Sequence, residues 1–429
     1  MAKETAQAEL DPELKADIVL ELPVAGTQWP PIVRALRHED YRLFWGGCML
    51  SNVGTWMQNV AQGWLVLELS NSSFWLGVVG FAAAVPFLLF TLLGGVIADR
   101  VSKRHLLIGA QTAQMILAFV LAGLTYFKVI NIGQLALIAF LVGISNAVNA
   151  PAYQAMVPKL VPPEDLQNAI ALNSAQFNLS RIVGPTLGGY ALAWVGMAGN
   201  FFLNGVSFLA VLWPLFRMRY PDEKPERSTS VLRSLRDGIL YVKRSPQMTA
   251  IVMLIASASL LLLPFITFVP YFAKDVLKVG ERGLGFLMAF SGIGALVAAG
   301  VVASFPKIRW RGRVIVFSGL FVMTAMIIFC YSHSMTLSAV MAFCEGFGMI
   351  ISLSTVNVTM QQLSSDVMRG RVMSIYATSF LGLPPVGCLI VGVLSRHMAT
   401  EHALAALIAI AMMCYIAFYL RSKPLRELD

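Results

Sequence analysis

The sequence predicts an all-α integral membrane protein with twelve transmembrane helices in two pseudo-symmetric six-helix bundles. Three observations predict this fold class: an apolar composition, twelve apolar stretches long enough to cross a bilayer, and one long basic segment that divides them six and six. Of the 429 residues, 57% are hydrophobic and 13% are charged, an apolar share well above that of soluble domains. The lipid bilayer is therefore the expected surroundings of this chain.

Each apolar stretch after Tyr41 reaches the roughly 20 residues that a helix needs to cross the bilayer. The expected spans are 43–68, 73–98, 105–127, 133–157, 166–194, 199–216, 248–272, 283–304, 313–331, 336–362, 371–395 and 403–420. The domains expected from this division are an N-terminal tail (1–40), a first bundle (41–216), a basic linker (217–245), a second bundle (246–420) and a C-terminal tail (421–429).

The basic residues are distributed unequally between the two sides of the expected spans. Of the 32 Lys and Arg residues, 26 fall on the side of the two termini, five fall on the other side, and Arg181 lies inside a span. The positive-inside rule then places both termini in the cytosol. The net charge of +9 is explained by this topology, and no nucleic-acid partner is expected because the basic residues do not form one patch.

Several function classes lack their sequence signatures. The five cysteines lie in apolar spans and the five histidines are not at metal-ligand spacing, so we expect neither a disulfide framework nor a metal site. There is no Walker-type phosphate loop, so direct hydrolysis of ATP by this chain is not expected. Neither a catalytic constellation nor a long soluble insertion is visible, so an enzyme is not expected. No cofactor is expected, and a proton gradient is the expected energy source.

The most informative stretch is Ser180 to Gly189, S-R-I-V-G-P-T-L-G-G. Arg181 lies near the middle of an apolar span, where a cation requires a cavity or a partner. Pro185 lacks an N–H group, so the carbonyl of Arg181 is left without its helical donor. Ser180, Gly184 and Gly188 form a small-residue stripe that allows another helix to approach closely.

A second motif, G-V-I-A-D-R-V-S-K-R, falls in the short turn between the second and third spans. It resembles the signature loop of the major facilitator superfamily, with Ser102 where that loop usually has glycine. The resemblance implies a gating role on the cytosolic side for Gly95, Asp99, Arg100, Lys103 and Arg104. Asp99 would face a helix N-terminus or the arginines at 369 and 371. The alternative is that the basic residues only set the topology.

The hexapeptide G-P-T-L-G-G resembles the motif that exporters and antiporters of this superfamily carry in their fifth helix. The matching residues, with the neighbouring arginine, are Arg181, Gly184, Pro185, Gly188 and Gly189. R-L-F-W at 42–45, G-T-W-M-Q at 54–58 and N-A-P-A-Y at 149–153 resemble the enterobactin-exporter and drug-efflux branch. The resemblance covers the chain and implies a monomeric, multi-pass protein of the inner (cytoplasmic) membrane that works by alternating access. The better-known drug/proton antiporters carry an arginine in helix 4; residues 133–157 contain none, so their coupling scheme is not carried over.

Polar residues inside the spans mark a candidate cavity. They recur on one helical face of the first span and continue in the fourth and fifth: Asn52, Thr55, Asn59, Gln62, Asn146, Asn149, Tyr153 and Gln176. Polar groups at this depth face protein or water. Substrate contact and hydrogen bonding between packed helices are equally weighted interpretations.

Glu345 is the one acidic residue deep within a span. Counted along the helices, its depth differs from that of Arg181 by about 5 Å across a core of roughly 30 Å. We hypothesise that the two bridge the halves in one state and separate in another, which would convert conformational change into proton uptake or release. A permanent pair, or separate partners, are the alternatives.

The sequence thus predicts a secondary active exporter of an amphipathic small molecule, such as a drug or a siderophore, with proton antiport. The alternatives are a lipid or lysolipid translocator of the same fold and a small-molecule importer.

Overall fold

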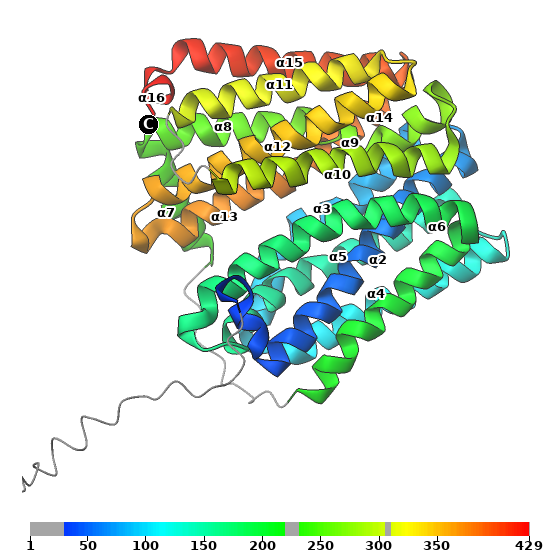
Figure 1. The fold of residues 1–429 in the computed structure, drawn as a ribbon, viewed down its shortest axis with the longest axis horizontal. Helices are drawn as coiled ribbons and strands as arrows, with labels where there is room; N and C mark the ends of the chain where they lie inside the picture. The colour runs from blue at the N-terminus through cyan, green and yellow to red at the C-terminus, as the bar shows by residue number, and fades with distance from the viewer. Residues whose placement is uncertain (1–29, 219–230, 305–309, 429) are drawn as a thin grey trace, which may run out of the picture.

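The structure, a computed structural model, describes residues 30–218, 231–304 and 310–428, without the side chains of 31, 87–88, 91–100, 231–235 and 366–367. Every regular element in these ranges is a helix (Figure 1). Those before the basic linker are η1 (Pro31–Arg37), α2 (Glu39–Ser70), α3 (Ser73–Arg100), α4 (Lys103–Tyr126), α5 (Ile132–Met156), η2 (Val157–Lys159), η3 (Pro163–Asp165) and α6 (Leu166–Arg217).

The helices from the linker onward are α7 (Val231–Arg244), α8 (Pro246–Leu261), α9 (Phe265–Tyr271), η4 (Phe272–Val276), α10 (Gly280–Ser304), α11 (Arg311–Cys330), α12 (Met335–Leu363), α13 (Asp366–Gly382), α14 (Pro384–Leu394), α15 (Thr400–Arg421) and α16 (Lys423–Arg426). Helices α2–α6, here the first half, pack mainly on one another, and α7–α16, the second half, do the same. Figure 1 shows the halves as two groups of long helices.

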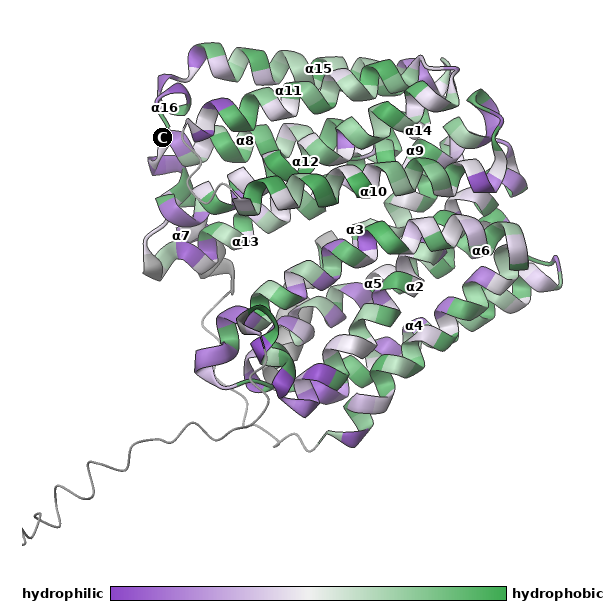
Figure 2. Cartoon of the chain, viewed as in Figure 1, coloured by the Kyte–Doolittle hydropathy of each residue, from purple (hydrophilic) through white to green (hydrophobic). Residues whose placement is uncertain are grey.

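Nine helical segments of the described residues are long and apolar enough to cross a membrane, and Ser73–Pro86 adds a shorter apolar helix. Figure 2 shows their apolar residues along the lengths of the helices and the polar ones gathered near the ends. Helix α2 has 32 residues but is not among the nine. Asn52, Asn59 and Gln62 lower its mean hydropathy, which is the expected property of a helix that faces protein or water.

Four expected spans differ from separate, continuous helices. The fifth and sixth form one element, α6, which turns at Gly196, where φ is +70°; only glycine adopts this conformation without strain. The expected span 248–272 is broken between α8 and α9 at Pro264, and the span 371–395 is broken at Pro384. A proline lacks the amide donor and disfavours helical geometry in the residue before it, which explains both breaks.

The two halves meet at one end of the molecule. We call this the distal end; it holds the α2–α3 loop, Gly196, the η4–α10 junction and the α14–α15 loop. We call the opposite end the terminal end; α2 and α8 begin there, and α15 ends there. Helix α3 packs on α14, and α6 packs on α10. Gly77 lies against the backbone of Cys388 and Gly392, and Gly189 lies against Gly285. These close approaches are all distal.

Candidate functional site

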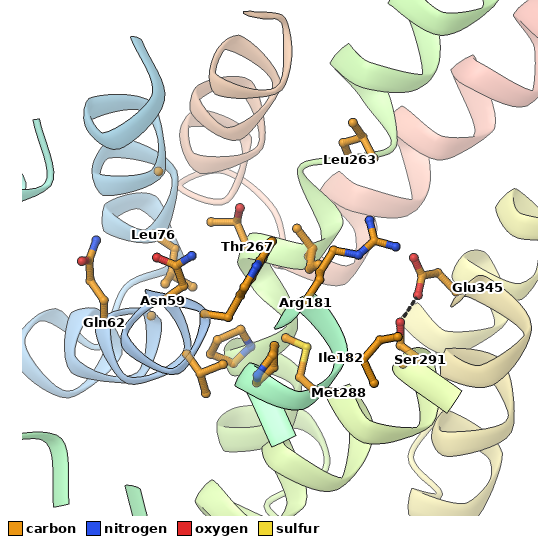
Figure 3. A pocket seen from close by; sticks show the side chains of 18 of the residues that line it. Asn59, Gln62, Leu76, Arg181, Ile182, Leu263, Thr267, Met288, Ser291 and Glu345 are labelled. Carbon is orange, nitrogen blue, oxygen red and sulfur yellow. Dashed lines mark hydrogen bonds between the residues drawn. The ribbon is translucent and has the colours of Figure 1, made fainter. Parts of the chain in front are cut away.

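A cavity of about 300 Å³ lies between the two halves (Figure 3). The first half lines it with residues of α2, α3 and α6, and the second half lines it mainly with apolar residues, together with Thr267, Ser291 and Glu345. Its main side chains are Trp56, Asn59, Gln62, Arg181, Pro185, Thr267, Met288, Ser291, Met326, Glu345 and Met349. Three methionines give the second half's wall a flexible, polarizable surface that adapts to differently shaped ligands.

Arg181 and Glu345 face this cavity from opposite halves, Arg181 from α6 and Glu345 from α12. Figure 3 shows the guanidinium of Arg181 directed towards the carboxylate of Glu345. The Ser291 hydroxyl donates a hydrogen bond of 2.6 Å to Glu345 Oε2. Of the ion pairs formed by the described residues, none joins Arg181 to Glu345 within 4.0 Å. The two charges therefore share a cavity without direct contact.

Glu345 also lines a second, smaller cavity of about 30 Å³, together with Ser291, Phe265 and Met341. This volume is enough for at least one water molecule. The carboxylate thus lies between the central cavity and a small space inside the second half.

The cavity follows from local backbone features of the sequence. Pro185 lines it within α6, and Leu263, Thr267 and Pro270 line it from the broken segment between α8 and α9. Irregular backbone is tolerated at membrane depth only where it is buried in protein or lines a cavity, so the break at Pro264 fits this position. Sequence analysis treated 248–272 as a regular span and missed Thr267 and Ser291; the run Leu262-Leu263-Pro264 was the available signal.

The G-P-T-L-G-G motif packs α6 on two partners at once. A Cβ atom on Gly184 would lie 2.4 Å from the Cβ of Trp56, and one on Gly188 would lie 2.9 Å from the Cα of Met57, so both glycines abut α2. A Cβ on Gly189 would lie 2.3 Å from the Cα of Gly285 in the other half. The motif thus sets the close approach of α6 both within its half and across the two halves.

Further contacts join the halves at the distal end, and sequence analysis did not identify them. The Lys274 ammonium donates hydrogen bonds to the carbonyl of Leu67 at 2.8 Å and to Asn71 Oδ1 at 3.2 Å. The Arg396 guanidinium lies 3.5 Å from the ring centroid of Phe74, a cation–π arrangement. Each pair has one member in each half.

The other predicted polar residues lie outside the lining of the central cavity. Asn146 accepts a hydrogen bond from Gln114 at 3.0 Å, and Asn149 accepts one from Gln111 at 3.2 Å, which joins α5 to α4. The Tyr153 hydroxyl donates to Gln176 at 3.3 Å. Asn52 and Thr55 lie on α2, and the Thr55 hydroxyl donates to the carbonyl of Ser51. Of the eight predicted polar residues, the cavity thus brings together Asn59 and Gln62.

Part of the predicted gating loop lies outside the described side chains, namely Gly95, Asp99 and Arg100. Lys103 begins α4. Arg104 donates hydrogen bonds to the carbonyls of Leu215 at 2.6 Å and Phe216 at 2.9 Å, which satisfies the C-terminal end of α6. The expected partner Arg371 donates to Asp237 of α7 at 3.1 Å.

Comparison with known families gives a match over residues 28–429 to the family described as Transmembrane secretion effector, part of the major facilitator superfamily. The chain belongs to this family. The match covers both halves and the linker.

Three curated relatives are similar to this chain over most of their length. The staphyloferrin A transporter of Staphylococcus aureus is 24% identical over 90% of this chain and 97% of its own. The multidrug efflux pump Tap of Mycolicibacterium fortuitum is 25% identical over 89% and 95%, and the enterobactin exporter EntS of Escherichia coli O1:K1 / APEC is 22% identical over 84% and 86%.

Solved structures share the fold of this transporter. A bacterial homolog of the human lysosomal transporter Spinster, in an inward-facing and unoccupied conformation, matches with a TM-score of 0.67 and 16% identity over 94% of this chain and 97% of its own. The nucleoside transporter NupG matches with a TM-score of 0.70 and 12% identity over 90% and 99%.

Proposed function

We propose that this chain is a secondary active exporter of an amphipathic small molecule, with twelve transmembrane helices in two six-helix bundles. The count is reached by adding α2, α3 and the second part of α6 to the nine long apolar segments. The observation that carries the proposal is the central cavity, which the two halves line together with Arg181 on one wall and Glu345 on the other. Relatives named as multidrug and enterobactin exporters support the direction of transport.

The terminal end is the cytosolic end in this proposal, and the membrane is the inner membrane. The excess of Lys and Arg on that side supports this orientation. Since the glycine contacts between the halves lie at the distal end, the cavity is closed towards the outside and loads from the cytosol. Rocking the halves about the cavity would open it outwards.

The substrate is an amphiphile in this proposal, because most of the wall is apolar and its polar and charged groups, including Asn59, Gln62, Arg181 and Glu345, are few. Such cavities bind apolar ligands by burial and orient them with a few polar groups. Drugs and siderophores are the substrate classes to test first.

Proton antiport is the proposed coupling. Because Arg181 and Glu345 belong to different halves, alternating access changes the distance between their charges and with it the affinity of Glu345 for a proton. The hydrogen bond from Ser291 comes from the same half as Glu345 and persists when the halves move as rigid bodies.

The function is tested in two steps. Cells of an efflux-deficient bacterium that express the chain are first screened for resistance to, or export of, dyes, antibiotics and siderophores. Transport of the compounds found is then measured in everted membrane vesicles from these cells. We expect substrate uptake that depends on an imposed pH gradient, and loss of that dependence in Glu345→Gln. Glu164→Gln, which makes the same change at an exposed position outside the cavity, is the matched control. Unchanged gradient dependence in Glu345→Gln would refute the coupling. Gradient-independent flipping of labelled lipid would instead favour a lipid translocator, and accumulation in whole cells would favour an importer.

A further inference from the structure

Each half carries a short helix that precedes its first long helix and lies on the start of a later one. In the first half, η1 precedes α2 and packs on α6; in the second half, α7 precedes α8 and packs on α13. When the first half of the sequence is aligned with the second by adding 203 to each residue number, Arg34 of η1 corresponds to Asp237 of α7, and Asn168 of α6 corresponds to Arg371 of α13. The docked helix is thus a repeated part of the architecture, although the two sequences have little in common.

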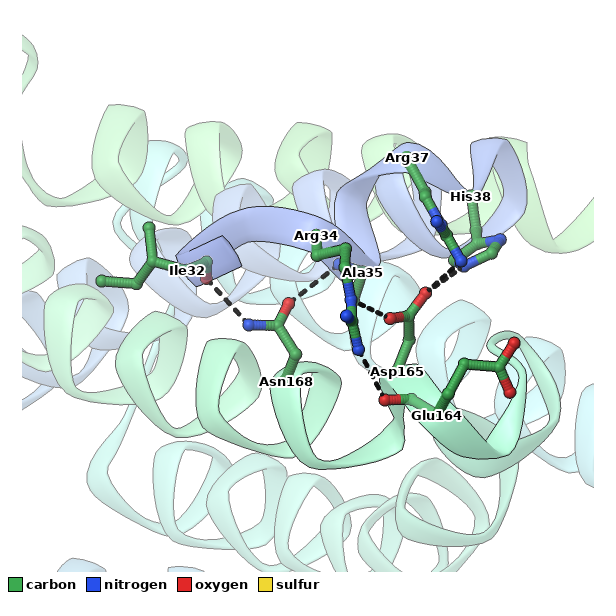
Figure 4. A network of polar contacts seen from close by, with 8 residues as sticks. All are labelled: Ile32, Arg34, Ala35, Arg37, His38, Glu164, Asp165 and Asn168. Carbon is green, nitrogen blue, oxygen red and sulfur yellow. Dashed lines mark hydrogen bonds and ion pairs between the residues drawn. The ribbon is translucent and has the colours of Figure 1, made fainter. Parts of the chain in front are cut away.

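Polar contacts fasten η1 to the start of α6 (Figure 4). The Asp165 side chain is fully buried and pairs with Arg34, with Arg37 at 3.0 Å and with His38 at 2.8 Å. Asn168 donates to the carbonyl of Ile32 at 3.0 Å and accepts from the amide of Ala35 at 2.8 Å. These bonds leave η1 with one fixed face towards the protein.

The second docking site uses the opposite polarity. Arg371 of α13 donates to Asp237 of α7 at 3.1 Å, so the acid lies on the docked helix and the base on its platform. The amide of Ser365 donates to the Tyr241 hydroxyl at 3.2 Å. Gly238 is buried, and a Cβ there would lie 3.2 Å from the Cβ of Arg371. Helix α7 is therefore also held with one face inwards.

The outer face of α7 mixes exposed apolar side chains with basic ones, whereas the two arginines of η1, Arg34 and Arg37, pair with Asp165 on its docked face. Ile32 of η1 is 77% exposed, and Ile239 and Leu240 of α7 are 40% and 44% exposed. Arg236, Lys243 and Arg244 are exposed on the same side of α7, because residues 236, 239, 240, 243 and 244 share one helical face. Charge next to exposed Ile and Leu is typical of helices that lie in a bilayer interface.

We propose that the outer face of α7 binds anionic lipid headgroups of the leaflet at the terminal end. Helix α7 ends at Arg244 and α8 begins at Pro246, so α7 lies where a membrane-crossing helix starts. Its basic residues complement an anionic surface, and its apolar residues reach no deeper than the interface. The inference rests on the proposed orientation of the two ends in the membrane, but not on the substrate or on proton coupling.

Lipid retention by the purified full-length protein tests this without a transport assay. The protein is equilibrated in detergent with equimolar phosphatidylglycerol and phosphatidylcholine, and bound lipids are counted by native mass spectrometry. The test variant combines Arg236→Gln, Lys243→Gln and Arg244→Gln, which leaves the Asp237–Arg371 anchor intact. The matched control combines Arg421→Gln, Lys423→Gln and Arg426→Gln, which removes the same charge at the same end of the molecule.

We expect the α7 variant to lose phosphatidylglycerol preference by at least tenfold, since each basic residue at a membrane surface contributes roughly fivefold, while the control keeps most of it. Ile239→Ser with Leu240→Ser should weaken retention of both lipids. An unchanged preference in the α7 variant, or an equal loss in the control, would overturn the proposal. A thermal unfolding curve for each variant shows whether it is folded. If the triple Gln variant of α7 does not fold, the Ile239→Ser and Leu240→Ser double variant still tests the proposal.

Discussion

Gly189 of α6 and Gly285 of α10 touch across the two halves, with no room for a side chain between them. A Cβ on Gly189 would lie 2.3 Å from the Cα of Gly285 and 3.1 Å from the carbonyl oxygen of Glu281. The obstacles are backbone atoms, which cannot rotate away. Gly189, the last glycine of the G-P-T-L-G-G motif, therefore controls how closely the halves approach at the distal end.

Gly189→Ala should open the distal end. The added methyl group cannot be accommodated without separating α6 from α10, which should destabilise the closed arrangement by ~1–3 kcal/mol. Distances between spin labels on the two halves should lengthen at the distal end, and transport should fall. Gly123→Ala is the control, because no atom lies within 4 Å of a Cβ at that position. Equal label distances in Gly189→Ala and the native protein would contradict this.

Lys274→Met should loosen the same end by removing the bonds to Leu67 and Asn71. Hydrogen bonds from a charged group contribute about 1.5–3 kcal/mol when buried, and the partial exposure of Lys274 reduces this to roughly 1 kcal/mol. We expect the buried thiol of Cys388, which lies at the α3–α14 contact, to react about fivefold faster with an impermeant maleimide. Lys278→Met, at an exposed neighbouring position, should leave the rate unchanged.

Arg181→Gln should abolish most transport, whereas Arg181→Lys should retain a part of it. The guanidinium faces the cavity and the Glu345 carboxylate, and lysine keeps the charge but not the planar group. We expect the transport rate in vesicles to fall at least tenfold in the glutamine variant. Arg217→Gln removes an exposed charge from the same helix and should transport normally. Full activity of Arg181→Gln would show that this charge has no role in transport.

Asp165→Asn should destabilise the first half. The substitution leaves Arg34, Arg37 and His38 without their shared carboxylate, and the loss of charge-assisted hydrogen bonds should lower the melting temperature in detergent by a few degrees. Glu164→Gln is a close control, because Arg34 bonds to the main-chain oxygen of Glu164 and this bond survives. Identical melting curves for the two variants would mean that the network contributes nothing measurable.

Most of the helical framework could be predicted from local sequence. Apolar stretches of sufficient length define membrane-crossing helices because the backbone must satisfy its own hydrogen bonds in lipid. The prolines at 264 and 384 were visible where the structure breaks α8–α9 and α13–α14. The sequence also singled out Arg181, Glu345, Asn59 and Gln62, all of which line the central cavity.

Position along a helix does not determine which neighbour a side chain meets. Asn59 on α2 and Asn149 on α5 are both amides in apolar helices, yet the first lines the cavity and the second bonds to Gln111 of α4. The difference depends on how each helix is rotated against its neighbours, and that rotation is set by packing across the whole half.

The sequence by itself determined the helical class and the presence of two opposite charges inside apolar stretches, because these depend on composition and on position along the chain. Only the tertiary structure decided that Arg181 and Glu345 face one cavity from opposite halves, that Gly189 meets Gly285, and that α7 and η1 are docked alike. These are contacts between residues distant in sequence, and they exist only once the helices have packed.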